Sequence, residues 1–295
     1  MKKQPLFVGS AVAICTPFHK DAIDYEKLEE LLQFQLDNGT DAIVICGTTG
    51  EPSTMTQKEH VQCIEHAISY INHRVPVIAG TGSNNTMHAA ELSVAAAKAG
   101  ADGLLLVTPY YNKCTQKGAI AHFNYIVEQA KIPAIIYNVP SRTGFSLNVS
   151  SYETLSRNPL MNGVKEACGN MAQVARTIAA CQEDFFVWSG NDDQIAPITA
   201  LGGKGVISVM ANIIPKQTAE LAHACLNGDY QKGGAMQCRL MELIDALFIE
   251  VNPIPVKTAL NLMGKDAGQL RLPLCEMDSK NLEILKTAMQ HAGLL

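Results

Sequence analysis

The sequence predicts an α/β protein, a (β/α)8 TIM barrel with a C-terminal helical extension. Short β-rich runs alternate with longer helical patterns from the N-terminus to about residue 227. Eight such runs occur, which is the number needed to close a barrel with right-handed crossovers. The β signal then stops after Asn227-Gly228-Asp229. We therefore expect a barrel domain over 1–228 and a helical domain over 229–295.

The eight candidate strands are each bounded by Gly, Pro, Asn or Asp. In order they are Val8–Cys15, Ala42–Cys46, Val77–Ala79, Gly103–Val107, Ala134–Tyr137, Gly163–Glu166, Phe185–Ser189 and Gly205–Val209. Most are apolar throughout rather than alternating, as expected of parallel strands buried on both faces.

Helical patterns with apolar residues at three- and four-residue spacing lie between these runs. They include Tyr25–Asp37, Gln57–Ile71, Met87–Ala99 and Ala119–Ala130, followed beyond residue 229 by Tyr230–Glu250, Pro255–Met263 and Asp278–His291. Asp24 and Thr56 are candidate N-caps, whereas Asn38-Gly39 and Ala99-Gly100 indicate helix ends.

An open, doubly wound sheet is the alternative architecture. It would normally carry Gly-x-Gly-x-x-Gly after its first strand, and Gly80-Thr81-Gly82 lacks both the third glycine and a suitably spaced acid. A nucleotide cofactor is therefore not expected.

Composition excludes several classes of function. The chain has 295 residues, 23 Lys+Arg and 28 Asp+Glu, which gives a net charge of −5 and no basic footprint for nucleic acid. We find no signal peptide and no apolar run long enough for a membrane span. The nine cysteines are scattered without a Cys-x-x-Cys pair, a pattern typical of free thiols in a reducing compartment. We expect a cytoplasmic protein.

Active sites of (β/α)8 barrels form where the strands end, so residues at those ends are candidates for chemistry. Lys165 lies inside the sixth predicted strand, where its ammonium would point into the barrel mouth. Desolvation there would lower its pKa and yield the neutral amine that Schiff-base formation needs. From position alone, however, a solvated or structural lysine is the more common case.

Two other strand ends, those of the second and fifth predicted strands, carry candidate groups. Tyr137 ends the neighbouring strand and could shuttle protons, although a buried tyrosine is more often a core residue. Thr48 and Thr49 occupy a Gly-bounded turn, where hydroxyls can bind a carboxylate or simply stabilise the turn. Arg142 could bind a substrate carboxylate with its forked guanidinium, although a lone arginine usually lies at the surface.

Metal and phosphate sites have little support. His60, Cys63 and His66 recur every three residues, so their side chains fan out along about 9 Å of helix and cannot share one ion. Gly202-Gly203-Lys204-Gly205 lacks the spacing of a phosphate-binding loop. We expect no metal.

Taken together, the motifs resemble the dihydrodipicolinate synthase/N-acetylneuraminate lyase family of Schiff-base pyruvate aldolases. The resemblance rests on segments that run in order through nearly the whole chain. They are Gly47-Thr48-Thr49-Gly50-Glu51, Thr108-Pro109-Tyr110-Tyr111-Asn112, Asn138-Val139-Pro140-Ser141-Arg142-Thr143-Gly144 after Tyr137, the strand-borne Lys165, Gly190-Asn191-Asp192 and Asn252-Pro253-Ile254-Pro255-Val256-Lys257. The motif that contains Arg142 resembles that of one branch of the family. Members of this branch condense pyruvate with L-aspartate-4-semialdehyde on the way to diaminopimelate and lysine.

The resemblance implies a role for each candidate. Lys165 would attack the pyruvate ketone, and Tyr137, Thr49 and Tyr111 would form a proton relay, with Tyr111 supplied by a neighbouring subunit. Thr48 and Thr49 would hold the pyruvate carboxylate. Arg142 would help to bind the semialdehyde, and Gly190 and Ile207 would present main-chain carbonyls. The iminium acts as the electron sink, so no cofactor is expected. The family's usual assembly implies a homotetramer, a dimer of tight dimers.

Two alternatives stay open. One is a related pyruvate aldolase or lyase, N-acetylneuraminate lyase-like, that acts on another aldehyde. The other is a catalytically silent barrel that binds a small carboxylate. The resemblance also bears on regulation, because some members bind lysine near the position of Tyr110. Here Asn84 matches their asparagine but His88 stands at the acidic position, and Gln57 and Pro52 also differ.

Overall fold

Eight parallel strands close into a barrel in the computed structural model, which describes residues 2–295. The order around the barrel is β1-β10-β9-β8-β7-β6-β5-β4. The strands are β1 (Gly9–Ala13), β4 (Ala42–Ile45), β5 (Val77–Gly80), β6 (Gly103–Val107), β7 (Ala134–Asn138), β8 (Met161–Glu166), β9 (Phe186–Ser189) and β10 (Gly205–Ser208). All eight predicted strands and the predicted fold class are confirmed.

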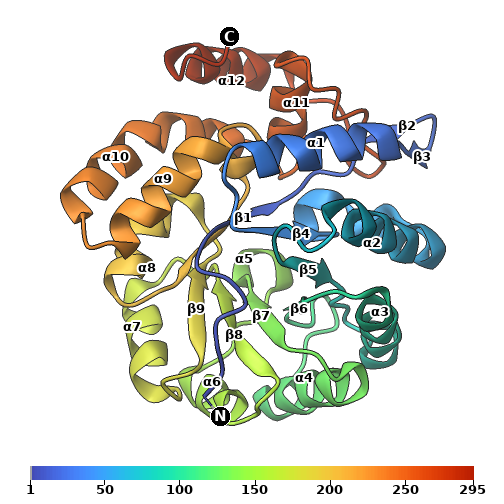
Figure 1. Cartoon of the computed structure of the whole chain (residues 1–295), viewed down its shortest axis with the longest axis vertical. Coiled ribbons are helices and arrows are strands. Elements are labelled where there is room, and N and C mark those ends of the chain that lie inside the picture. The colour runs from blue at the N-terminus through green and yellow to red at the C-terminus, as the bar shows by residue number, and fades with distance from the viewer. Residues whose placement is uncertain (1) are drawn as a thin grey trace.

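A ring of helices surrounds the strands (Figure 1). It consists of α1 (Tyr25–Asp37), α2 (Gln57–Ile71), α3 (Thr86–Ala99), α4 (Gln116–Ala130), α6 (Val149–Ser156), α7 (Met171–Ala180), α8 (Ile195–Ala200) and α9 (Pro215–Leu226). A short helix, α5 (Pro140–Thr143), and the 3-10 turns η1 (Thr48–Gly50), η2 (Pro52–Thr54), η3 (Asp192–Gln194) and η4 (Met210–Asn212) follow strand ends.

The predicted helix caps are present. Asp24 accepts a hydrogen bond from the Lys27 amide, and Thr56 forms a reciprocal capping box with Glu59. Gly100 ends α3 with a positive φ of 96°, a conformation that glycine adopts without the usual steric cost.

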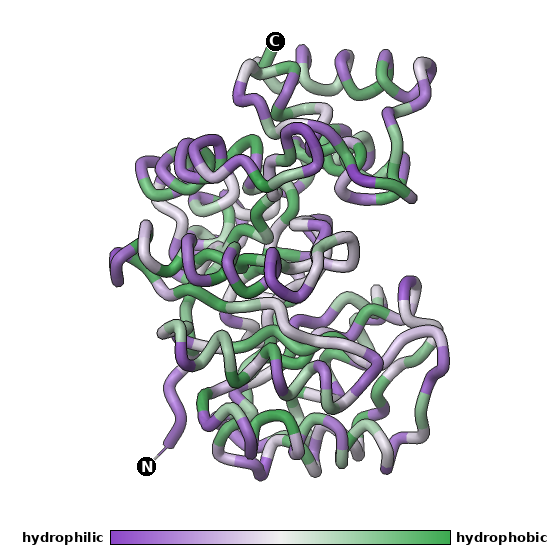
Figure 2. Tube along the Cα trace, turned by 90° about the vertical axis from the view of Figure 1, so that its right-hand side faces the viewer, coloured by the Kyte–Doolittle hydropathy of each residue, from purple (hydrophilic) through white to green (hydrophobic). Residues whose placement is uncertain are grey.

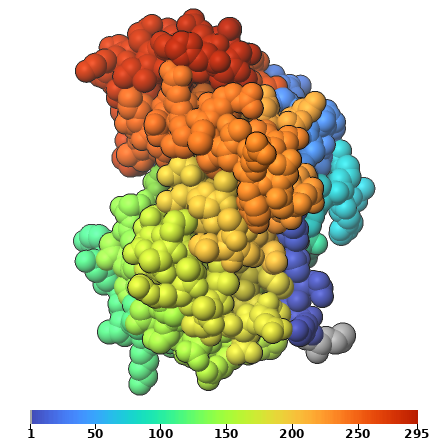
Figure 3. All heavy atoms as spheres, turned by 90° about the vertical axis from the view of Figure 1, so that its left-hand side faces the viewer, coloured from blue at the N-terminus to red at the C-terminus, as the bar shows by residue number. Residues whose placement is uncertain are grey.

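The C-terminal extension is helical, as predicted. It contains α10 (Tyr230–Leu247), α11 (Ile254–Leu262) and α12 (Ser279–His291), so α10 ends three residues before the predicted boundary. Figure 3 shows these helices gathered over one end of the molecule. The sequence missed a small hairpin, β2 (Phe18–His19) with β3 (Ala22–Ile23), because two-residue strands are too short to show a period.

Two apolar layers form the core, and the apolar stretches of the trace run through the interior in Figure 2. Inside the barrel, Ala13, Val44, Ile135, Trp188 and Ile207 pack together with Tyr137. The outer layer lies between the strands and the helices. No helix within residues 2–295 has the length and apolar character needed to cross a bilayer.

Candidate active site

Lys165 and Tyr137 lie side by side at the ends of β8 and β7. The strand register pairs Tyr137 with Lys165 and Lys165 with Trp188, and Trp188 faces the barrel interior. The Lys165 Nζ lies 4.3 Å from the centre of the Tyr137 ring. Only 4% of Lys165 is exposed. The sequence-predicted lysine is therefore a buried amine at the barrel mouth.

The electrostatic environment favours the neutral form of this amine. Burial lowers the pKa of Lys165 to about 7, and the positive charge of Arg142 acts in the same direction. The carboxylate of Asp192 opposes them, because its negative charge favours the ammonium. Burial also raises the pKa of the Tyr137 phenol, so this group holds its proton at neutral pH.

Hydrogen bonds to Glu166 join the ends of β7 and β8 on the outer face of the barrel. Glu166 accepts hydrogen bonds from Asn138 Nδ2 and Tyr152 Oη, both at 2.8 Å, and from the Cys168 amide at 2.9 Å. Because successive side chains of a strand point to opposite faces, fixing Glu166 outward fixes Lys165 inward. Glu166 was not identified from the sequence.

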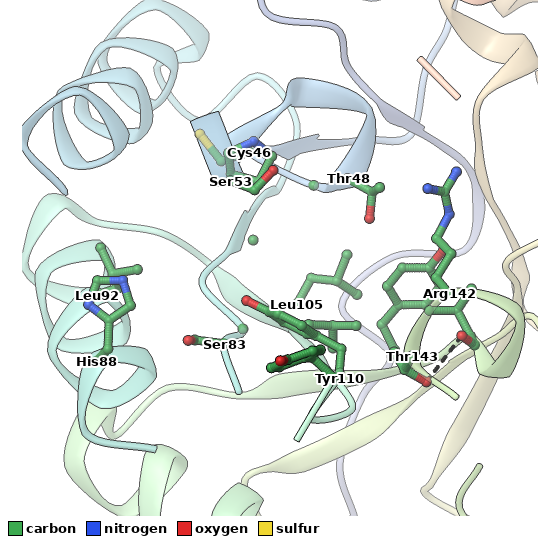
Figure 4. A pocket seen from close by; sticks show the side chains of 18 of the residues that line it. Cys46, Thr48, Ser53, Ser83, His88, Leu92, Leu105, Tyr110, Arg142 and Thr143 are labelled. Atoms are coloured by element: carbon green, nitrogen blue, oxygen red, sulfur yellow. Dashed lines mark hydrogen bonds between the residues drawn. The ribbon is translucent and has the colours of Figure 1, made fainter. Parts of the chain in front are cut away.

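A cavity of about 940 Å³ opens beside Tyr137. The residues that line it include Thr48, Tyr111, Tyr137, Arg142, His60, His88 and Leu92. Figure 4 shows Thr48 and Arg142 on one side of this space, with His88 and Leu92 opposite them. Lys165, Thr49, Gly190 and Ile207 are not among the wall residues.

The two predicted threonines have different surroundings. Thr48 is half-buried and lines the cavity, whereas Thr49 is buried. The Thr49 Oγ1 accepts a hydrogen bond of 3.0 Å from Asn252 Nδ2, which belongs to the C-terminal extension. The structure thus brings Thr48, not Thr49, to the cavity beside Tyr137.

Arg142 and Tyr111 both lie at the outer end of the site. Arg142 is exposed on α5, and its Nη2 donates to the main-chain carbonyl of Asn252 at 3.3 Å. Tyr111 is 91% exposed and has a φ of 66°, a left-handed conformation that is costly for an aromatic residue. Its ring is therefore almost fully exposed at the wall of the cavity.

Gly190 and Ile207 lie deeper. A Cβ at Gly190 would come within 2.8 Å of the Ala167 Cβ and 3.1 Å of the Lys165 Cγ, so only glycine leaves the lysine stem its space. Ile207 is fully buried in the inner barrel layer with Tyr137. Nearby, the buried Asp192 accepts from the amides of Val209 and Met210.

Within residues 2–295, no group of three or more His, Cys, Asp or Glu side chains is arranged to hold a metal ion. The arrangement at Lys165 is instead suited to covalent chemistry by an amine. A buried amine with a pKa near neutrality, flanked by a protonated phenol, can attack a carbonyl and receive help with proton transfer.

Comparisons with known proteins find similarity over nearly the whole chain. The family model described as "Dihydrodipicolinate synthetase family" matches residues 6–292. The 4-hydroxy-tetrahydrodipicolinate synthase of Thermoanaerobacter sp. (strain X514) is 56% identical over 292 residues, covering 99% of this chain and 98% of that protein.

Solved structures of dihydrodipicolinate synthases also match nearly the whole chain. The pyruvate complex of the chloride-inhibited dihydrodipicolinate synthase from Acinetobacter baumannii superposes with a TM-score of 0.95 and 42% identity, covering 98% of this chain and 99% of that one. The lysine-bound enzyme of Cyanidioschyzon merolae gives a TM-score of 0.96 and 38% identity, with 99% and 100% coverage.

Proposed function

The chain belongs to the dihydrodipicolinate synthetase family, and on this basis we propose that it condenses pyruvate with L-aspartate-4-semialdehyde to 4-hydroxy-tetrahydrodipicolinate, in diaminopimelate and lysine biosynthesis. The observation that carries this proposal is the buried Lys165, whose pKa of about 7 leaves a large share of free amine at neutral pH.

The chemistry follows from that amine. Its lone pair attacks C2 of pyruvate, and loss of water leaves an iminium on Lys165. Because the iminium accepts electrons, a proton can leave the pyruvate methyl group to give an enamine, whose carbon attacks the aldehyde. The amino group of the bound aldehyde then displaces Lys165, which closes the ring and frees the enzyme.

The proton transfers in this series of reaction steps need hydroxyl groups beside the amine. The 4.3 Å contact between Lys165 and the Tyr137 ring supports this role for Tyr137. We propose Thr48 rather than Thr49 as its hydroxyl partner, because Thr48 lines the cavity with Tyr137 while the Thr49 Oγ1 is bound to Asn252. Tyr111 completes the relay from a neighbouring subunit, within a homotetramer built from two tight dimers.

We expect both substrates to bind to the walls of the same cavity. The η1 turn, with Thr48 and Thr49, holds the pyruvate carboxylate, and Arg142 receives the aldehyde's carboxylate with its forked guanidinium. Gly190 and Ile207 contribute main-chain carbonyls near Lys165. We place the reaction in the cytoplasm, where the free state of all nine cysteines would be maintained.

A coupled assay with pyruvate and aspartate-4-semialdehyde tests the proposal directly. The expected result is turnover that requires both substrates. Turnover with a different aldehyde in preference to aspartate-4-semialdehyde would support instead the related lyase activity, and binding of pyruvate without turnover would indicate a catalytically silent barrel.

Lysine is expected to inhibit this enzyme weakly or not at all. In sensitive relatives an acidic residue meets the α-ammonium of lysine, and His88 stands at that position here. The cavity walls described carry no carboxylate at all. Losing a charge-assisted hydrogen bond removes about 1.5–3 kcal/mol, a tenfold to hundredfold loss of affinity.

A lysine dose–response curve measures this effect. His88→Glu is the matched variant, because it returns a carboxylate to the same cavity wall and should increase sensitivity. Half inhibition of the unmodified enzyme below about 1 mM, equivalent to roughly −4 kcal/mol, would contradict the prediction.

A further inference from the structure

The η1 turn is held from outside the barrel. Asn252 lies between α10 and α11 in the C-terminal extension and is 5% exposed. Its Nδ2 donates to the Thr49 Oγ1 over 3.0 Å, across 203 residues of sequence. Both groups are buried, so this hydrogen bond is sheltered from water, and leaving either partner unpaired would be costly.

A second contact joins the same two segments. Lys257 Nζ donates to the Glu51 carboxylate at 2.7 Å, and each side chain is 1% exposed. Glu51 ends the η1 turn with a φ of 55°, a conformation in which non-glycine residues need support from their surroundings. Asn252 and Lys257 therefore anchor the turn at its second threonine and at its last position.

This anchoring determines which threonine faces the substrate. Because the Thr49 hydroxyl is turned toward Asn252, the preceding residue, Thr48, presents its side chain to the cavity. Rotation of the turn would move the Thr48 side chain out of the cavity that it shares with Tyr137. The extension thus holds the pyruvate side of the site in place.

Asn252 also reaches the aldehyde side through its main chain. Its carbonyl accepts the hydrogen bond from Arg142 Nη2. The side chain and the carbonyl of one residue therefore serve two different walls of the cavity. A substitution of the side chain removes the first contact and leaves the second available.

We propose that Asn252 is a positioning residue for pyruvate, acting through Thr49 from the C-terminal extension. This proposal rests on the function proposed above. It explains why the Asn252-Pro253-Ile254-Pro255-Val256-Lys257 segment, which lies outside the barrel, accompanies the Gly47-Thr48-Thr49-Gly50-Glu51 turn in this chain.

The test is a double-mutant cycle with Asn252→Ala and Thr49→Val, in which pyruvate KM and aldehyde KM are both measured. Each single variant should raise the pyruvate KM about tenfold, the worth of one buried hydrogen bond. The double variant should be no worse than either single one, because both remove the same contact. The aldehyde KM of Asn252→Ala should change less than about threefold, since the carbonyl that holds Arg142 remains.

Thr49→Ser keeps the hydroxyl and should recover most of the loss caused by Thr49→Val. Asn261→Ala is the control within the extension, because Asn261 Nδ2 donates to the Gly268 carbonyl and does not contact the turn. It should lower the melting temperature without raising the pyruvate KM. This separates a positioning role from general weakening of the extension.

Borohydride trapping of pyruvate on Lys165 separates failure of this proposal from failure of the proposed function. No trapping in the unmodified enzyme would overturn the function itself. Normal trapping together with an unchanged pyruvate KM in Asn252→Ala, or additive losses in the double variant, would overturn the positioning role alone.

Discussion

Lys165→Arg is expected to abolish turnover, with a loss on the order of 10⁴-fold or more, and to abolish borohydride trapping of pyruvate. A guanidinium stays protonated at every accessible pH and cannot attack a ketone, although it occupies nearly the same space and keeps the positive charge. The readouts are the coupled assay and intact-protein mass, which in the unmodified enzyme should increase by one reduced pyruvyl group per chain.

Peptide mapping of the trapped enzyme locates the adduct. Lys257 provides an internal control, because it is equally buried but its Nζ is bound to Glu51 and to the Gln269 carbonyl. Labelling at Lys257, or at any lysine other than Lys165, would refute the assignment. So would trapping that survives in Lys165→Arg.

The same lysine predicts the acid limb of the pH–rate profile. Burial is the main cause that lowers its pKa to about 7, so the fraction of free amine falls as the pH drops through that value. The rate constant for adduct formation should therefore decrease about tenfold per pH unit below this point. Measured in single-turnover trapping with pyruvate alone, a rate that continues to rise tenfold per pH unit up to about pH 9 would show that the amine is not desolvated.

The barrel could be predicted because its signals are local. Each strand is a short apolar run with a Gly, Pro, Asn or Asp boundary, and runs such as Gly103–Val107 agree with the structure at both ends. Lys165 stood out for the same reason, since a lysine within a buried strand is rare and its direction follows from strand alternation.

The details of the site that the sequence does not show depend on contacts with distant segments. Nothing in the local sequence distinguishes Thr48 from Thr49, because the difference is made by Asn252, 203 residues away from Thr49. Glu166 was hidden for a related reason. A glutamate next to the key lysine looks like an ordinary strand end until Tyr152 and Asn138 are seen to bind its carboxylate.

Mixing two inactive variants, Lys165→Ala and Tyr111→Phe, is expected to restore activity. Alone, each should lose at least about a hundredfold, the scale of a lost general acid–base group. If Tyr111 serves the neighbour's site, one site of a mixed dimer receives Lys165 from one chain and Tyr111 from the other. Random exchange of equal amounts makes about half of the dimers mixed, each with one intact site, so roughly a quarter of the original activity should return.

The geometry of Tyr111 is the reason to expect this. A tyrosine that is 91% exposed and held in a left-handed conformation gains nothing from that strain within its own chain. A partner that buries the ring and uses its hydroxyl would offset the cost. The control is Lys165→Ala mixed with Tyr137→Phe. It should give no recovery, because Lys165 and Tyr137 are in contact at 4.3 Å within one barrel and every site of a mixed dimer then lacks one of them.

In the Lys165→Ala and Tyr137→Phe mixture, one barrel lacks Lys165 and the other lacks Tyr137. Each site therefore carries one defect, and neither can turn over. In the Lys165→Ala and Tyr111→Phe mixture, both defects fall in one site and the other is complete. If subunit exchange is verified and the mixture of Lys165→Ala and Tyr111→Phe stays inactive, Tyr111 acts within its own chain.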